Sequence, residues 1–223
     1  MIMKKLTIFL SAVIVLFTLC SCKNTINLEM YLSEIRHCVY KYEGEDYAVT
    51  VYAEEKESPY LNDGYVGEIK KYLTVKIEDY KSSLSDASVT LSFGDITATG
   101  KFEYSPLNGK FLTEIEVSKL PTEERLTATV KNVGEEKSFE IEKFTSNGKI
   151  SYSTALEKVA ESEQKAIEKM LSPSGASIEA RVRILTEGES VYYYVSITDK
   201  NGSTSAFLVD GASGEILARK DFK

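Results

Sequence analysis

Residues 47–52, YAVTVY, decide the fold of the first half of the chain, because apolar residues at 47, 49 and 51 alternate with the residues between them. A period of two is typical of a half-buried β-strand, in which successive side chains point to opposite faces of the sheet. The alternation returns at residues 72–77, 89–93, 96–104, 111–117, 126–130 and 139–144.

Turn residues separate these apolar runs. Asn108-Gly109 is the strongest of them, because a type I′ hairpin needs positive φ at both central positions. Roughly seven short strands with no helix between them are typical of an antiparallel sandwich. We therefore predict an antiparallel Ig-like β-sandwich over residues 40–145. The chain has no Trp and no cysteine pair in this region, so Ig-like describes the architecture alone.

The pattern changes after residue 145. Thr154 and Glu157 form a capping box that predicts the start of a helix, and Pro173 and Gly175 predict its end. Strand patterns follow at residues 178–184, 191–197, 207–209 and 215–218. Residues 146–223 are thus predicted to be a small α+β domain, with one helix packed on an antiparallel sheet.

This last segment resembles the PepSY family of small exported domains. The likeness rests on the helix at 155–160 (ALEKVA), the strand at 192–197 (YYYVSI) and the ending at 207–217 (FLVDGASGEIL). The resemblance implies a binding or regulatory module without catalytic residues, of a kind often suspected of restraining peptidases. It carries over Asp210 and Gly214 as structural turn residues, with Asp210 capping the turn and Gly214 taking positive φ.

The N-terminus predicts export. Lys4-Lys5 precede an apolar run over residues 6–19, which is shorter than the roughly 20 residues that span a bilayer. Residues 19–22, LCSC, resemble a bacterial lipobox, which implies that residues 1–21 are a lipoprotein signal peptide and that Cys22 is lipidated. The expected location is the extracytoplasmic side of a bacterial cell membrane. Residues 22–39 are then predicted to be a short tether followed by a first strand.

Charge narrows the classes of partner. Without residues 1–21 the chain has 25 basic and 34 acidic residues, a net charge of −9. The acidity is concentrated in residues 40–145, with 13 basic against 21 acidic residues, whereas residues 146–223 have 10 against 11. Nucleic-acid binding needs clustered Lys and Arg, so we predict no nucleic-acid partner. Membrane attachment is expected to come from the lipid on Cys22.

The chain contains few residues of the kinds that act in catalysis or bind metals. His37 is the only histidine and lies next to Cys38. Strand alternation predicts that their side chains diverge, with His37 on the surface and Cys38 buried. A histidine-rich metal site is excluded, and no glycine-rich phosphate loop occurs. We therefore predict no catalytic residues, no metal and no cofactor.

Tyr192 and Tyr194 are the candidate partner-binding residues. Alternation with Val191, Val195 and Ile197 places Tyr193 in the core and its two neighbours on the other face. The predicted function is a non-enzymatic, lipid-anchored protein that binds or regulates another envelope protein, with modulation of an envelope peptidase as one such role. The alternative is a ligand-capturing lipoprotein or sensor that holds a small molecule between its two domains.

Overall fold

The computed structural model describes residues 26–222 except 62, 82–83, 107–108, 146–148 and 172–177. The predicted signal peptide at residues 1–21 and the lipidation site Cys22 lie outside the described residues, as do Asn108, Pro173 and Gly175. Within this part of the chain, thirteen strands form one hydrogen-bonded sheet and α2 is the one α-helix. The prediction of a mainly β chain with antiparallel strands and a single α-helix is confirmed.

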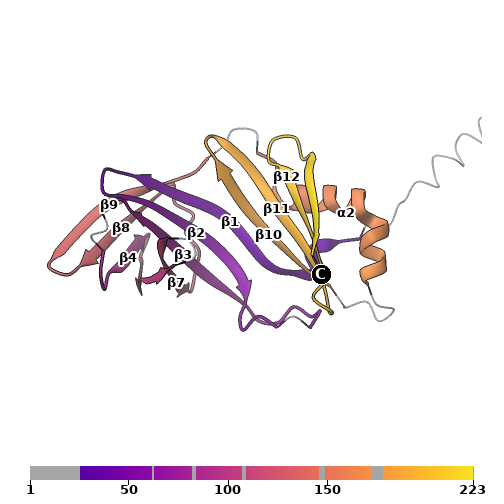
Figure 1. Ribbon diagram of the computed structural model, residues 1–223, viewed down its shortest axis with the longest axis horizontal. Coiled ribbons are helices and arrows are strands. Elements are labelled where there is room, and N and C mark those ends of the chain that lie inside the picture. The colour runs from indigo at the N-terminus through magenta and orange to yellow at the C-terminus, as the bar shows by residue number, and fades with distance from the viewer. Residues whose placement is uncertain are drawn as a thin grey trace, which may run out of the picture.

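Figure 1 shows the helices and strands of the chain, coloured in sequence order. They are η1 (Leu28–Tyr31), β1 (Leu32–Glu43), β2 (Tyr47–Glu57), β3 (Ile69–Asp79), β4 (Ser88–Phe93), β5 (Ile96–Lys101), β6 (Glu103–Ser105), β7 (Lys110–Val117), β8 (Arg125–Asn132), β9 (Glu135–Lys143), α2 (Tyr152–Met170), β10 (Ile178–Glu187), β11 (Ser190–Asp199), β12 (Thr204–Asp210) and β13 (Ile216–Phe222).

Strands β1–β9 form a barrel-like half that encloses the first core, a cluster of buried residues that includes Val51, Leu73, Leu91, Leu126 and Ile141. One wall runs β1-β2-β3-β7-β6 and the other runs β9-β8-β4-β5. The walls join where Tyr40 and Lys41 of β1 pair with Lys143 and Glu142 of β9. Each fully buried Leu or Ile in such a core stabilises the fold by roughly 1.5–3 kcal/mol. An Ig-like sandwich is a finer assignment than this barrel-like arrangement, and it stays a prediction.

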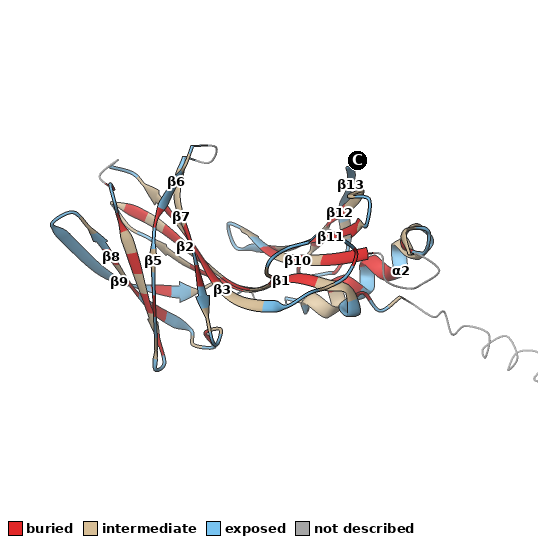
Figure 2. Ribbon diagram, turned by 90° about the horizontal axis from the view of Figure 1, so that it is seen from below, coloured by how far each residue is buried: buried red, intermediate tan, exposed pale blue. Residues whose placement is uncertain are grey.

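Strand β1 belongs to both halves of the molecule. Its first residues, from Leu32 to Arg36, pair in parallel with β10, while its other edge pairs along its length with β2. Every other strand pairing between described residues is antiparallel. One curved sheet therefore runs from the barrel-like half into the C-terminal half (Figures 1 and 2).

Residues 22–39 are predicted to be a short tether followed by a first strand, and the structure describes this segment from residue 26. Residues 32–39 are strand, and residues 28–31 are a 3-10 helix. Its Leu28 is buried in the second core, the cluster of buried residues between α2 and strands β10–β12. Asn27 caps this helix by accepting a hydrogen bond from the Glu29 amide at 3.1 Å. Burial of Leu28 contributes roughly 1.5–3 kcal/mol, which holds residues 28–31 against the second core.

The C-terminal half packs α2 on one face of strands β10–β12 (Figure 2). The helix buries Ala155, Leu156, Val159, Ala160 and Ile167, whose spacing by three, four and seven places them on one stripe. Its N-cap is Ser151, not Thr154 as the capping box predicted. The Ser151 hydroxyl accepts from the Thr154 amide at 3.0 Å, which satisfies one of the amides left free at a helix start.

Candidate binding surfaces

Tyr192 and Tyr194 lie on the face of β11 that points away from α2. Tyr193, between them, is buried in the second core and donates a hydrogen bond to the Ile150 carbonyl at 2.7 Å. Burial raises the pKa of Tyr193 to about 12. The two outer tyrosines are half-buried, so part of each ring remains accessible to a partner.

Apolar neighbours extend these tyrosines into a patch. Leu185 on β10 stands opposite Tyr192, and Leu208 on β12 stands opposite Tyr194. Directly opposed side chains on one face of a sheet touch each other. We call Leu185, Tyr192, Tyr194 and Leu208 the tyrosine patch. Its members are half-buried or exposed, and Tyr is enriched where proteins meet.

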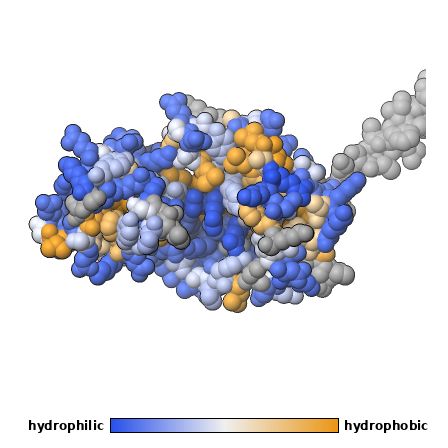
Figure 3. Space-filling model, viewed as in Figure 1, coloured by the Kyte–Doolittle hydropathy of each residue, from blue (hydrophilic) through white to orange (hydrophobic). Residues whose placement is uncertain are grey.

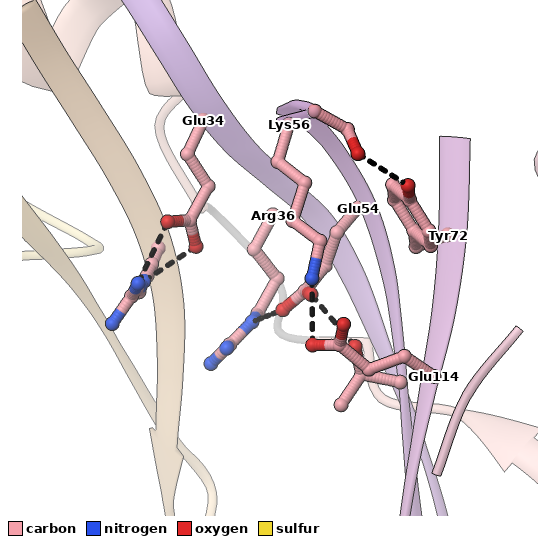
Figure 4. A network of polar contacts seen from close by, with 9 residues as sticks. Glu34, Arg36, Glu54, Lys56, Tyr72 and Glu114 are labelled. Carbon is pink, nitrogen blue, oxygen red and sulfur yellow. Dashed lines mark hydrogen bonds and ion pairs between the residues drawn. The ribbon is translucent and has the colours of Figure 1, made fainter. Parts of the chain in front are cut away.

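A row of paired charges crosses the same face of the sheet next to the patch (Figure 4). Arg183 on β10, opposite Tyr194, donates to both carboxylate oxygens of Glu34 on β1, at 2.5 and 2.6 Å. Arg36 Nε donates to Glu54 Oε1 at 2.6 Å. These pairs and the ion pair of Lys56 with Glu114 are named here the charged ladder, which links β10, β1, β2 and β7.

Burial and neighbouring charge fix the ladder in place. Glu34 and Glu54 are only 8% and 3% exposed. Burial raises the pKa of the Glu34 carboxyl, but the hydrogen bond and charge of Arg183 outweigh it and leave that pKa below its ordinary value. Glu54 also accepts from the Thr74 hydroxyl at 2.9 Å. Bidentate and charge-assisted bonds of this kind hold side chains in defined positions.

Cations and an aromatic ring continue the ladder across β2 and β3. The Arg36 guanidinium lies 3.7 Å from the centre of the Tyr52 ring, and Lys76 Nζ lies 4.9 Å from it. Burial, together with the charge of Arg36, lowers the pKa of Lys76. The ladder was not predicted from the sequence. Its available signal is the charge repeated at alternate positions in Glu34/Arg36 and in Glu54/Lys56.

The surface that carries the ladder is hollowed. Figure 3 shows hydrophilic residues in a depression at the middle of the molecule, over β1 and β10, with hydrophobic residues near the upper end of β12. In Figure 2 the sheet curves so that the barrel-like half and β13 rise on either side of β1 and β10. The tyrosine patch and the charged ladder together are called the concave face below.

Asp210 and Gly214 form the turn between β12 and β13. The Asp210 carboxylate accepts from the Ser213 amide at 2.7 Å and the Ala212 amide at 3.1 Å, and these bonds lower its pKa. Gly214 has φ of +76°, a backbone conformation that glycine adopts without strain. Both residues act within the turn, and Asp210 also pairs with Tyr192 across β11 and β12, at the edge of the tyrosine patch.

His37 and Cys38 do not diverge as strand alternation predicted. A β-bulge lets Arg36 pair with Glu54 and Cys38 with Ala53, so that His37 is left as the extra residue. His37 Nε2 and Glu55 Oε2 are hydrogen-bonded at 3.0 Å. Cys38 is buried, and burial raises the pKa of its thiol, which leaves little thiolate.

These two residues contribute to a hollow of about 540 Å³ at the junction of the two halves. The hollow lies on the side of the sheet opposite the ladder, against the loop between β7 and β8. Four lysines line it together with apolar and small residues: Lys71, Lys119, Lys143 and Lys149, with His37, Cys38, Ala53, Glu55, Leu120, Pro121 and Thr122. Among the side chains that the structure describes, no three His, Cys, Asp or Glu could hold a metal ion together.

Comparison with protein-family models finds no match, and comparison with curated proteins finds no relative. Within the described ranges, no helix combines the length and the apolar character needed to cross a membrane.

Proposed function

We propose that this chain is a non-enzymatic, lipid-anchored protein of the extracytoplasmic side of a bacterial membrane, and that its concave face holds a segment of another envelope protein. The observation that carries the proposal is the joining of the tyrosine patch and the charged ladder on one face of a continuous sheet. An apolar and aromatic centre beside fixed charges of both signs is the composition of a protein-binding surface. Modulation of an envelope peptidase is one role such a surface can serve.

The architecture supports the resemblance to the PepSY family. A helix followed by antiparallel strands, with the Asp210 turn before the last strand, has the order that the family resemblance implies. The Ig-like assignment for residues 40–145 draws support from the two walls that enclose one core. A strand edge on β13 that pairs with no described strand offers a further place for a partner's backbone.

Lipid anchoring is tested through Cys22. We expect Cys22→Ser to remove incorporation of labelled palmitate and to move the protein from the membrane fraction to the soluble fraction. Cys20→Ser, two residues earlier in the same LCSC stretch, is the matched control and should leave both properties unchanged. Palmitate labelling that survives Cys22→Ser, or that is lost equally with Cys20→Ser, would reject Cys22 as the anchor.

Partner binding is tested by photo-crosslinking in intact cells. A photoreactive amino acid at Tyr194 should give a discrete crosslinked product, and the same residue at exposed Tyr80, in the turn after β3, should not. Adding Leu185→Glu, a change at a 36% exposed position, should reduce the Tyr194 product at least fivefold. Equal products from both positions, or a Tyr194 product unaffected by Leu185→Glu, would refute binding at the concave face.

A further inference from the structure

Four lysines converge on the junction hollow in a chain that is acidic elsewhere. Residues 40–145 have 13 basic against 21 acidic residues, yet three of these lysines, Lys71, Lys119 and Lys143, come from that region. They come from β3, from the loop after β7 and from the end of β9, and Lys149 joins them from the segment before α2. Segments this far apart in sequence meet here through the fold, not through a local basic run.

Little negative charge compensates these lysines. Glu55 is the one carboxylate that lines the hollow, and it is held by His37 Nε2 at 3.0 Å. Lys143 pairs with Glu124 at 3.5 Å, and the structure gives no ion pair within 4 Å between the other three lysines and any described residue. Four lysines against Glu55 and the Glu124 that pairs with Lys143 leave a net charge of +2 around the hollow when His37 is neutral.

The residues that line the hollow favour dense anions as ligands. Lysine ammonium groups are compact point charges that suit dense anions, and the lining contains no arginine fork of the kind that matches a single carboxylate. Apolar atoms of Ala53, Leu120 and Pro121 give an organic group something to lie against. The hollow's volume of about 540 Å³ falls within the range of small-molecule sites.

We propose that the junction hollow binds a phosphate-bearing molecule through Lys71, Lys119, Lys143 and Lys149, with its organic part against Leu120 and Pro121. The site lies on the opposite side of the sheet from the concave face, so it does not depend on the proposed protein partner. Two sources share this chemistry: a soluble phosphate ester or diphosphate, and a phospholipid headgroup of the membrane beside the anchored chain.

The test uses residues 23–223 and two probes. Inorganic pyrophosphate, titrated by calorimetry at low salt, represents the soluble source, and vesicles of phosphatidylcholine with phosphatidylglycerol represent the headgroup. Lys119→Ala/Lys149→Ala removes two exposed pocket lysines, and Lys131→Ala/Lys200→Ala removes two exposed lysines elsewhere, which matches the change in net charge. Lys119→Arg/Lys149→Arg retains the charge.

We expect the pocket double alanine variant to weaken binding of at least one probe tenfold or more. The matched control and the arginine variant should stay within about threefold of the unaltered chain, because charge at the hollow and not total charge holds the anion. The probe that responds identifies the source. Failure of the unaltered chain to bind either probe, or equal weakening in the pocket and control variants, would overturn the proposal. Both results leave crosslinking at Tyr194 unaffected, so the two proposals fail separately.

Discussion

Arg183→Met tests whether the charged ladder holds the two halves of the sheet together. Arg183 on β10 makes two hydrogen bonds to Glu34 on β1, at 2.5 and 2.6 Å, across the parallel pairing that joins the halves. Methionine keeps the aliphatic stem of the side chain and removes the guanidinium. Glu34, 8% exposed, would then remain buried without its bidentate partner.

The expected loss in the free energy of unfolding is about 2 kcal/mol. Removing one partner of a fully buried pair costs about 3–5 kcal/mol. The Arg183 side chain is 38% exposed, and the charges of Arg181 and Arg36 still act on Glu34, so solvent and neighbours reduce that figure. Urea unfolding of residues 23–223, followed by far-ultraviolet circular dichroism at pH 7, measures the change.

Arg125→Met is the matched control. Arg125 also pairs with two carboxylate oxygens, of Glu140 and Glu142, but its side chain is 62% exposed and the loss should stay below about 0.5 kcal/mol. The pKa of Glu34 lies below its ordinary value of 4.5, so its contribution is present above that pH and is lost as pH falls through the folded-state pKa. The penalty of Arg183→Met should therefore shrink below pH 4.5. A loss no larger than that of Arg125→Met, or a loss independent of pH, would refute the reasoning.

Three further predictions concern single buried positions. Gly211→Ala should lower the free energy of unfolding by about 2 kcal/mol in urea melts, because a Cβ there would lie 2.8 Å from Val191 Cγ1 and 2.9 Å from its carbonyl carbon; an unchanged midpoint would contradict the close approach. Glu57→Gln should raise stability at pH 7 by roughly 1 kcal/mol, because it removes a buried negative charge that burial and the neighbouring Glu179 disfavour, while its amide oxygen can still accept from the Gly67 amide. Burial raises the pKa of Glu57, so the contribution of its carboxyl to the free energy of unfolding is lost as pH rises through the folded-state pKa. Between about pH 4.5 and 8, the midpoint of thermal unfolding should therefore fall more steeply for the native chain than for the variant. Alkylation of Cys38 at pH 8, in a chain starting at residue 23, should be at least tenfold slower in buffer than in urea, and equal rates would show that the thiol is accessible.

Much of the fold could be predicted because most strands show a local alternation of apolar and polar residues in the sequence. Residues 47–52, 72–77 and 191–197 alternate in sequence, and their alternate apolar residues are buried, although Thr74 and Ser196 on the other face are buried as well. Strand β1 was harder to predict, because the bulge at His37 breaks its period of two and because Glu34 is both charged and buried. Its parallel pairing with β10, which joins residues such as Ile35 and Val182, leaves no local mark on the sequence.

The two candidate surfaces also differ in how much of each could be predicted from the sequence. Strand parity alone identifies Tyr192 and Tyr194 as residues of the face opposite the second core. The basic lining of the junction hollow could not be predicted, because Lys71, Lys119 and Lys149 lie on different elements and come together only in the folded chain. Clean local periods reveal faces, whereas sites between distant segments require the pairing of strands to be known.

The concave face depends on β1 pairing with β2 on one edge and with β10 on the other. Hydrogen–deuterium exchange of residues 23–223 measures this directly. We predict that the amides of residues 32–36 exchange as slowly as those of the central strands β2 and β11, because one continuous sheet protects them all. Exchange of residues 32–36 at the rate of an exposed loop, with β11 still protected, would contradict a single sheet and with it the concave face.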